Sequence, residues 1–550
     1  YVHKMITGRA DDFESLRQEG GLSGYPSRAE SIHDVIENSH ASTALSYADG
    51  IAKAFEIHGE GDRHVVAVVG DGALTGGMTW EALNNIADGS NRSIVIVVND
   101  NERSYSPTIG GMARHLATLR TTKGYEKFLD WGKSVLERTP VVGAPVYDAL
   151  HGMKKGIKDF IAPQGLFEDL GLKYIGPIDG HNISDMEFGF QRARDFGGPV
   201  IVHVITEKGR GYKPAETDEA DRFHAVGIVD ADTGKPLTQS AKSWTSVFSG
   251  ELVAIGSQRQ DLVAITAAML GPTGLDAFAE KFPTRTFDVG IAEQHAVTSA
   301  VGMAHAGLHP VIAIYSTFLN RAVDQVIMDC ALHKAGVTFA LDRSGVTGDD
   351  GASHNGMWDM ALLRVVPNLD LFAPRDGQQL KSALRNSVAK SDHPTVIRFS
   401  KGPVPADIPA VTQLGFADVL VAAEQPEVTI VAIGVMATQS LEAAKSLQDQ
   451  GFRVEVIDPI QVLPISPDLI DYLSTREFVV TIEDGLVDGG IGEAIGSALR
   501  NINSRTRVLS LGIPKQFLDH ATRKSILNKL HLDAQGISET IARGLKATVI

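Results

Sequence analysis

Residues 64–101 read HVVAVVGDGALTGGMTWEALNNIADGSNRSIVIVVNDN, and this stretch decides the fold of the chain. The apolar run at 65–69 predicts a buried strand that ends at the Gly-Asp-Gly turn of residues 70–72. Residues 78–87 then predict a helix, and residues 94–98 predict a second buried strand. A strand, a helix and a second strand in this order predict a βαβ unit of a parallel sheet.

The same alternation returns in the rest of the chain. Further strands are predicted at Val263–Thr266, Val311–Tyr315, Val428–Gly434, Val454–Ile457 and Phe478–Ile482. The sequence therefore predicts an α/β fold of three successive α/β domains with mostly parallel sheets. A polar stretch at 213–244 and a proline-rich one at 403–413 separate them, so we expect domains at 1–228, 241–402 and 414–550. Strand signals fade near 103–164, where we expect a long excursion over the surface or over a site.

Charge and cysteine content exclude several classes of protein. The 550 residues carry 51 Lys and Arg against 67 Asp and Glu, a net charge of −16, so we expect neither nucleic acid nor an anionic membrane as partner. One cysteine, Cys330, excludes disulfide frameworks and cysteine-based metal sites. The chain has no apolar run of 18 residues and no signal-peptide pattern at its start, which predicts a cytoplasmic protein.

Polar side chains follow both strands of the first βαβ unit. Asp71 comes directly after the first strand, and Asn101 follows the second. Ligands of parallel sheets bind at the carboxyl ends of the strands, so we expect these side chains to lie close together. Carboxylate and amide oxygens suit Mg²⁺ or Ca²⁺, and the glycines let the backbone approach a diphosphate. Taken alone, the two motifs also fit a plain strand-end turn and a helix cap.

Together, the two motifs resemble the thiamine-diphosphate-binding signature, Gly-Asp-Gly followed about 30 residues later by Asn. The resemblance implies that the Asp71 and Asn101 side chains and the backbone carbonyl of Arg103 hold Mg²⁺. It also implies that Gly72 and Ala73 contact the diphosphate through their backbone. Such enzymes need a glutamate that hydrogen-bonds the aminopyrimidine nitrogen of the cofactor, and DVGIAEQH at 288–295 supplies one.

Six stretches, in their order along the chain, indicate which family of thiamine-diphosphate enzymes the sequence resembles. They read GGLSGYP at 20–26, DVGIAEQH at 288–295, YSTFLNRA at 315–322, DRSG at 342–345, DGASHNG at 350–356 and IRF at 397–399. Across the chain they resemble the 1-deoxy-D-xylulose-5-phosphate synthase family. The resemblance implies a transketolase-like fold and a transferase that uses thiamine diphosphate and Mg²⁺. That transferase joins pyruvate to D-glyceraldehyde 3-phosphate, releases CO₂ and serves isoprenoid and thiamine biosynthesis as a homodimer.

The family pattern also implies roles for single residues. The implied catalytic residues are Glu293 and His354; the implied substrate-binding residues are Tyr315, Arg321, Arg343, Asp350 and Arg398; and the implied cofactor contacts are Ser39, His40, Ala41, Ser42, Tyr212, Glu293 and Phe318. Arginines suit a phosphate, and a histidine exchanges a proton near neutral pH. Singly, each arginine also fits a surface salt bridge. Ser39 departs from the family pattern, which has glycine at this position.

Two other functions fit parts of this pattern. A transketolase shares the cofactor but transfers a ketol group without releasing CO₂, and the stretches at 315–321 and 350–354 favour the synthase. A thiamine-diphosphate-binding protein without turnover is the other alternative, and it has no need for Glu293. The family pattern includes a segment with active-site histidines upstream of Tyr1, so we expect the printed sequence to be part of a longer chain.

Overall fold

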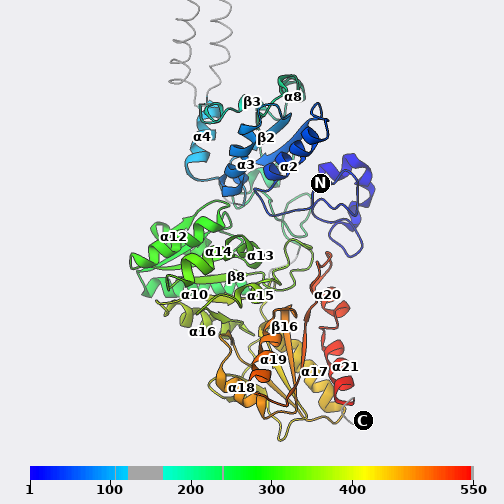
Figure 1. Cartoon of the computed structure of the whole chain (residues 1–550), viewed down its shortest axis with the longest axis vertical. Helices are drawn as coiled ribbons and strands as arrows, with labels where there is room; N and C mark the ends of the chain where they lie inside the picture. The colour runs from blue at the N-terminus through cyan, green and yellow to red at the C-terminus, as the bar shows by residue number, and fades with distance from the viewer. Residues whose placement is uncertain (106, 122–164, 238–240, 547–550) are drawn as a thin grey trace, which may run out of the picture. The chain divides into compact units, whose positions relative to one another are not determined.

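The structure is a computed structural model, and it describes residues 1–105, 107–121, 165–237 and 241–546 (Figure 1). The described chain forms two compact units. The first-sheet unit comprises residues 41–237 and 289–292, and the two-sheet unit comprises residues 1–40, 238–288 and 293–550. The predicted excursion near 103–164 lies largely outside the described residues; its described part includes helix α4 (Gly110–Thr121).

The first-sheet unit contains a four-stranded, fully parallel sheet in the order β1-β2-β4-β3. Its strands are β1 (Val65–Gly70), β2 (Ile94–Asp100), β3 (Lys173–Asp179) and β4 (Val200–Ile205), and its helices besides α4 are α2 (Ala44–Ile57), α3 (Gly77–Asp88), α7 (Gly165–Asp169), α8 (Ile183–Phe196) and α9 (Lys213–Thr217). The predicted βαβ unit is confirmed, with Gly70 of β1 in register with Asn99 of β2.

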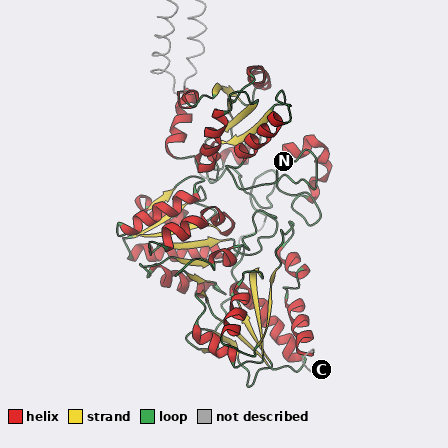
Figure 2. Ribbon diagram, in the orientation of Figure 1, coloured by secondary structure: helices red, strands yellow, loops and turns green. Residues whose placement is uncertain are grey.

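Both faces of this sheet are covered by helices (Figure 2). Successive residues of β2 point to opposite faces, as in any strand. Ile94 and Ile96 belong to a buried cluster with Leu45 of α2, whereas Val95 belongs to a second cluster with Ala193 of α8. This burial on both sides explains why the strand reads as a continuous apolar run, and each such side chain contributes about 1.5–3 kcal/mol.

The two-sheet unit contains a seven-stranded sheet in the order β15-β9-β10-β8-β7-β5-β6, parallel except at its β15 edge. Its strands are β5 (Leu262–Thr266), β6 (Thr286–Asp288), β7 (His309–Tyr315), β8 (Thr338–Asp342), β9 (Asp370–Phe372), β10 (Thr395–Arg398) and β15 (Gln461–Leu463). The helices along this part of the chain are α10 (Trp244–Gln258), α11 (Asp276–Lys281), α12 (Glu293–His305), α13 (Ser316–Leu319), α14 (Val323–Gln325), α15 (Asp359–Leu363) and α16 (Gly377–Val388).

The second sheet of this unit has six strands in the order β11-β12-β14-β13-β16-β17. Its strands are β11 (Thr412–Gln413), β12 (Asp418–Val421), β13 (Val428–Ala432), β14 (Val454–Asp458), β16 (Phe478–Leu486) and β17 (Arg507–Ile513), and its helices are α17 (Ala437–Asp449), α18 (Pro467–Ser474), α19 (Ile491–Asn501), α20 (Arg523–Lys529) and α21 (Ala534–Lys546). Only the β11 and β12 edge is antiparallel.

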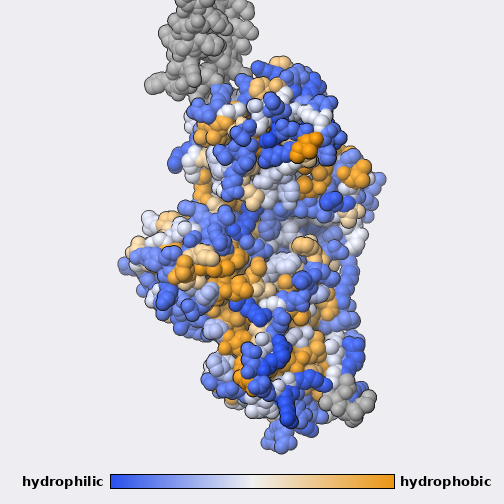
Figure 3. Space-filling model, viewed as in Figure 1, coloured by the Kyte–Doolittle hydropathy of each residue, from blue (hydrophilic) through white to orange (hydrophobic). Residues whose placement is uncertain are grey.

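Three mostly parallel sheets with flanking helices confirm the predicted α/β fold class. Hydrophilic residues cover much of the face seen in Figure 3, with apolar residues between them. None of the described helices has the length and apolar character needed to cross a membrane. The predicted domain boundaries at 228, 241, 402 and 414 stay predictions.

Candidate active-site residues

Asp71 and Asn101 meet just beyond the carboxyl ends of β1 and β2. The Asp71 side chain is buried, its carboxylate accepts a hydrogen bond from the backbone N–H of Asn101, and Thr108 donates to Oδ2 over 2.5 Å. Burial raises the pKa of Asp71, and the neighbouring Asp100 raises it further. A buried carboxylate of this kind is stabilised by a cation, so the donor set fits a hard metal ion such as Mg²⁺.

Arg103 is held beside Asn101. Its backbone N–H donates to Asn101 Oδ1 over 3.2 Å, and its guanidinium donates to the carbonyl of Ala220 over 2.6 Å. These contacts fix the backbone around the predicted carbonyl ligand. The predicted set therefore comes from two places, with Asp71 in the short 3-10 helix after β1, and Asn101 and Arg103 in the loop after β2.

Glycines allow the chain to pack closely beside Asp71. A Cβ added to Gly72 would lie 3.2 Å from Ser104 Cβ, and one added to Gly76 would lie 2.1 Å from Ser42 Oγ. Ser42, which follows Ala41, has a φ of 73° and donates from Oγ to the carbonyl of Ala73 over 3.0 Å. The structure thus brings Ser42 and Ala73 together in a closely packed backbone, and their contact with a diphosphate stays a prediction.

Lys208 is a residue that the sequence analysis missed. Its Nζ donates to the carbonyl of Ser104 over 2.5 Å and lies 2.7 Å from His224 Nδ1. Burial lowers the pKa of Lys208 to about 8, although Asp221 and Asp71 oppose this change. Lys208 therefore supplies a partly buried positive charge on the side of the sheet where Asp71 lies. Lys208 begins the stretch KGRGY at 208–212, which also contains the predicted cofactor contact Tyr212.

Tyr212 directly precedes helix α9. Its hydroxyl donates to the carbonyl of Ala231 over 2.8 Å, and its ring meets that of Phe223 edge-on at 5.8 Å. The structure thus places Tyr212 against the segment at 223–231, and its role in cofactor binding stays a prediction.

Glu293 begins helix α12 in the two-sheet unit. Its side chain is buried, and its Oε2 lies 4.0 Å from Nη1 of Arg321. Burial raises the pKa of Glu293, while its own backbone N–H and Arg321 act in the opposite direction. A carboxyl whose protonated form is favoured in this way can share a proton with a basic ring nitrogen.

Aromatic side chains gather beyond the end of β7. The Phe318 ring stacks on Tyr315 at 5.7 Å and meets the rings of His40 and His354 edge-on at 5.0 and 5.6 Å. The Arg343 guanidinium lies over the Tyr315 ring, 3.8 Å from its centroid. We call Tyr315, Phe318, His40 and His354 the aromatic cluster. It brings together residues that the sequence predicted separately, and its flat faces suit a planar ring.

His40 is tied to the segment that carries His354. Its Nε2 lies 2.9 Å from the carbonyl oxygen of Ser353 and 3.3 Å from Thr317 Oγ1. Burial lowers the pKa of His40, and the charge of Arg321 lowers it further. The imidazole of His40 is therefore neutral near pH 7, and Nε2 donates to the Ser353 carbonyl.

Asp350 is held by two cations that the sequence analysis did not name. Its carboxylate accepts from Lys401 over 2.7 Å and from Arg17 over 3.2 Å. Although burial alone would raise the pKa of Asp350, Lys401 lowers it below its ordinary value. Asp350 is therefore ionised and faces His354, whose pKa it raises.

Arg398 sits in a buried ion pair. Its Nε donates to Asp359 Oδ2 over 2.8 Å, and its Nη2 donates to the backbone carbonyl of Asp484 over 2.8 Å. Both partners lie too far along the sequence to be foreseen from the IRF stretch. The predicted contact of Arg398 with a phosphate stays a prediction.

Comparisons with known proteins cover almost the whole chain. A family model described as 1-deoxy-D-xylulose-5-phosphate synthase matches residues 1–206. The models of the transketolase pyrimidine binding domain and the transketolase C-terminal domain match residues 240–406 and 417–537. These matches confirm the predicted transketolase-like fold.

Three curated relatives are similar over the same length. The chain is 62% identical to 1-deoxy-D-xylulose-5-phosphate synthase 2 of Kitasatospora griseola, over 98% of this chain and 86% of the relative. It is 60% identical to 1-deoxy-D-xylulose-5-phosphate synthase 2 of Streptomyces coelicolor, over 98% of this chain and 84% of the relative. It is 59% identical to the 1-deoxy-D-xylulose-5-phosphate synthase of Thermobifida fusca, over 98% of this chain and 85% of the relative.

Proposed function

Since this chain belongs to the 1-deoxy-D-xylulose-5-phosphate synthase family, we propose that the residues around Asp71 and Glu293 carry out that family's reaction. The enzyme is a transferase that condenses pyruvate with D-glyceraldehyde 3-phosphate, giving 1-deoxy-D-xylulose 5-phosphate and CO₂. Identities of 59–62% over nearly the whole chain support this activity above ketol transfer or binding without turnover. Mg²⁺, a homodimer and a cytoplasmic location are further parts of the proposal.

Two sets of residues would hold the cofactor. In the first-sheet unit, the Asp71 carboxylate, the Asn101 amide and the Arg103 carbonyl would bind Mg²⁺, and the backbone at Gly72 and Ala73 would contact the diphosphate. When bound, thiamine diphosphate supplies a nucleophilic carbon and a sink for the electrons released with CO₂. Lys208 would add positive charge that balances the diphosphate.

The burial of Glu293 is the observation that supports this proposal most directly. Glu293 is a buried carboxyl at the start of α12, and burial favours its protonated form. In that form it would donate a hydrogen bond to the ring nitrogen of a bound aminopyrimidine, and its carboxylate could accept the proton again later in the reaction. Phe318, in the aromatic cluster, would stack on the same ring.

Substrate contacts would come from the residues around the aromatic cluster. Arg343, held over Tyr315, and Arg321, near Glu293, carry the positive charge that pyruvate's carboxylate and the triose phosphate require. His354 is neutral near pH 7 because burial lowers its pKa to about 4. Its imidazole would lie against the substrate as a neutral polar group that adds no charge.

Release of CO₂ from carboxyl-labelled pyruvate tests the proposal. We expect release that requires thiamine diphosphate and Mg²⁺, that rises strongly with D-glyceraldehyde 3-phosphate, and that yields 1-deoxy-D-xylulose 5-phosphate. Glu293→Gln should abolish it, whereas Glu280→Gln, on the exposed face of α11, should not. Bound cofactor without CO₂ release, or ketol transfer between sugar phosphates, would contradict the proposal.

A further inference from the structure

The imidazole of His354 lies between two hydroxyl groups from residues 1–40. Ser39 Oγ is 3.1 Å from Nδ1, and Tyr25 Oη is 3.3 Å from Nε2. The Tyr25 ring also stacks on the imidazole, with centroids 5.1 Å apart and planes inclined by 16°. Both ring nitrogens of one histidine are therefore matched by side chains that can either donate or accept.

Charged and titratable groups surround this histidine. Burial lowers its pKa to about 4, and His40, Arg343 and Arg17 act in the same direction, while Asp350 acts against them. The imidazole is therefore neutral near pH 7, and it carries one N–H donor and one acceptor nitrogen.

The neighbours indicate which nitrogen carries the proton. Arg17 interacts with the Tyr25 side chain, with its guanidinium carbon 5.4 Å from the ring centroid. A guanidinium has donors only, so the Tyr25 oxygen accepts from Arg17 and its hydroxyl can donate to His354 Nε2. With Tyr25 as the donor, Nδ1–H can donate to Ser39 Oγ, and the Ser39 hydroxyl can donate to Ser353 Oγ, with which it forms a short hydrogen bond.

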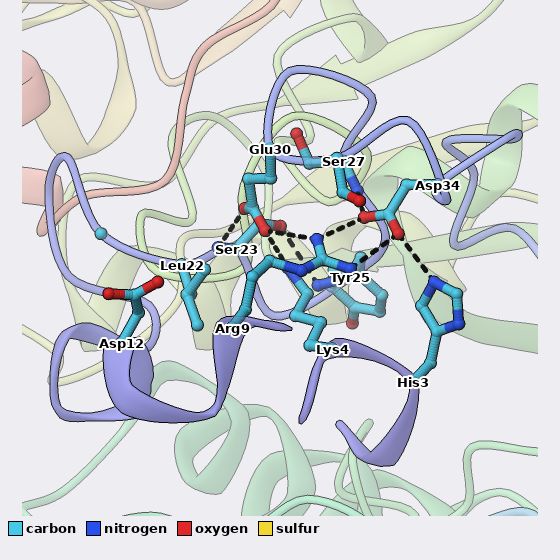
Figure 4. A network of polar contacts seen from close by, with 12 residues as sticks. His3, Lys4, Arg9, Asp12, Leu22, Ser23, Tyr25, Ser27, Glu30 and Asp34 are labelled. Carbon is cyan, nitrogen blue, oxygen red and sulfur yellow. Dashed lines mark hydrogen bonds and ion pairs between the residues drawn. The ribbon is translucent and has the colours of Figure 1, made fainter. Parts of the chain in front are cut away.

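A buried ionic network fixes Tyr25 in place (Figure 4). The backbone N–H groups of Ser23 and Ser27, two residues to either side of Tyr25, donate to Glu30 over 2.6 Å and to Asp34 over 2.8 Å. Arg9 in turn donates to both oxygens of Asp34, over 2.8 and 2.9 Å.

Two further residues of this network contact Glu30 and Asp34. Lys4 donates to Glu30 over 2.5 Å, and His3 lies 2.8 Å from Asp34. The loop that presents Tyr25 is therefore anchored at both ends by paired charges, buried at Asp34 and partly buried at Glu30, which makes it a rigid support for a hydrogen bond.

We propose that Tyr25 and Ser39 are positioning residues that hold His354 as the neutral tautomer with its proton on Nδ1 and its lone pair on Nε2. The two hydroxyls act oppositely on the histidine: a donor to Nε2 favours the neutral ring, whereas an acceptor from Nδ1–H favours the protonated ring. The relevance to catalysis rests on the proposed function of His354.

Histidine-labelled protein without cofactor or substrate provides the test. The His354 resonance, assigned with His354→Gln, is titrated by NMR in Tyr25→Phe, Ser39→Ala and the unaltered chain. We expect Tyr25→Phe to raise the pKa of His354 and Ser39→Ala to lower it, each by about half a pH unit. Ser39→Thr, which keeps the hydroxyl, should restore the original value, and Ser474→Ala, whose hydroxyl bonds only within its own helix turn, should leave it unchanged.

Outcomes separate this proposal from the proposed function. Shifts in the same direction, reversed shifts or no shift would overturn it, whatever the activity of the enzyme. Opposite shifts in a protein that makes no 1-deoxy-D-xylulose 5-phosphate would support the positioning roles while the proposed function fails. Where activity is present, the acid limb of the kcat profile should move with each titration. If Tyr25→Phe does not fold, the Ser39 variants alone decide.

Discussion

Arg398 donates from Nε to Asp359 over 2.8 Å, and both side chains are buried. The charge of Arg398 is thus balanced inside the protein before any substrate arrives. This relationship gives Arg398 a role in stability as well as the predicted role in binding a phosphate, and the two roles can be separated by experiment.

Arg398→Ala should lower the free energy of unfolding by about 3–5 kcal/mol, because it leaves Asp359 buried without its partner. Urea unfolding measures this change. Arg364→Ala removes a partly exposed pair with Glu493 at 3.4 Å and should cost less than about 1 kcal/mol. In the folded fraction, Arg398→Ala should raise KM for D-glyceraldehyde 3-phosphate more than KM for pyruvate. Equal changes in both would argue against a phosphate contact.

Glu293→Gln should reduce kcat by at least about a hundredfold while leaving the fold intact, because it removes the group that exchanges a proton with the cofactor ring. Steady-state CO₂ release and circular dichroism measure the two effects. Retention of more than a tenth of the activity would contradict the role of Glu293.

Asp71→Asn should weaken Mg²⁺-dependent binding of thiamine diphosphate by about tenfold or more, because an amide replaces a charged metal ligand. Titration calorimetry with and without EDTA measures the loss. Asp88→Asn, at the exposed end of α3, is the matched control. A variant that binds as tightly as the original chain, with the same need for metal, would remove Asp71 from the metal site.

Asp342→Asn should change how stability depends on pH. Burial raises the pKa of Asp342 to about 7, so the folded chain keeps a proton that the unfolded chain loses near pH 4. The contribution of Asp342 to stability should therefore fall between about pH 4 and 7, by at most about 4 kcal/mol, and level off above pH 7.

The variant should lack this contribution, so its stability should fall less over this range than that of the original chain, as measured by urea unfolding at several pH values. Thr245, which donates to Asp342 over 2.6 Å, can donate equally to the amide oxygen of the variant. Asp407→Asn, at an exposed carboxyl, should retain the decline. Identical pH profiles for Asp342→Asn and the original chain would show that Asp342 is ionised in the folded protein.

The fold could be predicted where apolar runs are bounded by turns. Strands β1, β2, β5, β7, β13, β14 and β16 match the predicted runs. Two of the other strands have weak or long-range patterns: β3 contains Pro177 and charged residues, and β15 follows β14 in the chain yet pairs with β9 of the other sheet. Pairing of that kind depends on tertiary packing, which no local pattern encodes. Strands β4 and β8 are buried apolar runs that the sequence did show but that were not predicted.

Only the site residues that belong to local sequence motifs could be predicted. The approach of Asn101 to Asp71 follows from parallel strands that end at one edge, so it was expected. The partners of Arg398 and the cations on Asp350 come from segments far along the chain, and Arg17 and Lys401 are ordinary surface residues in the sequence. Their roles arise from contacts, not from local composition.

The N-terminal network and the pair that it supports differ in the length of chain they close. Arg9 reaches Glu30 and Asp34 across 21 and 25 positions, whereas Tyr25 reaches His354 across 329. The entropy lost on closing a loop grows with its length, and long-range contacts form late. The ionic network can therefore form early in folding, and His354 acquires its Tyr25 partner only when the two ends of this long loop come together, so the order of assembly runs from the support to the histidine.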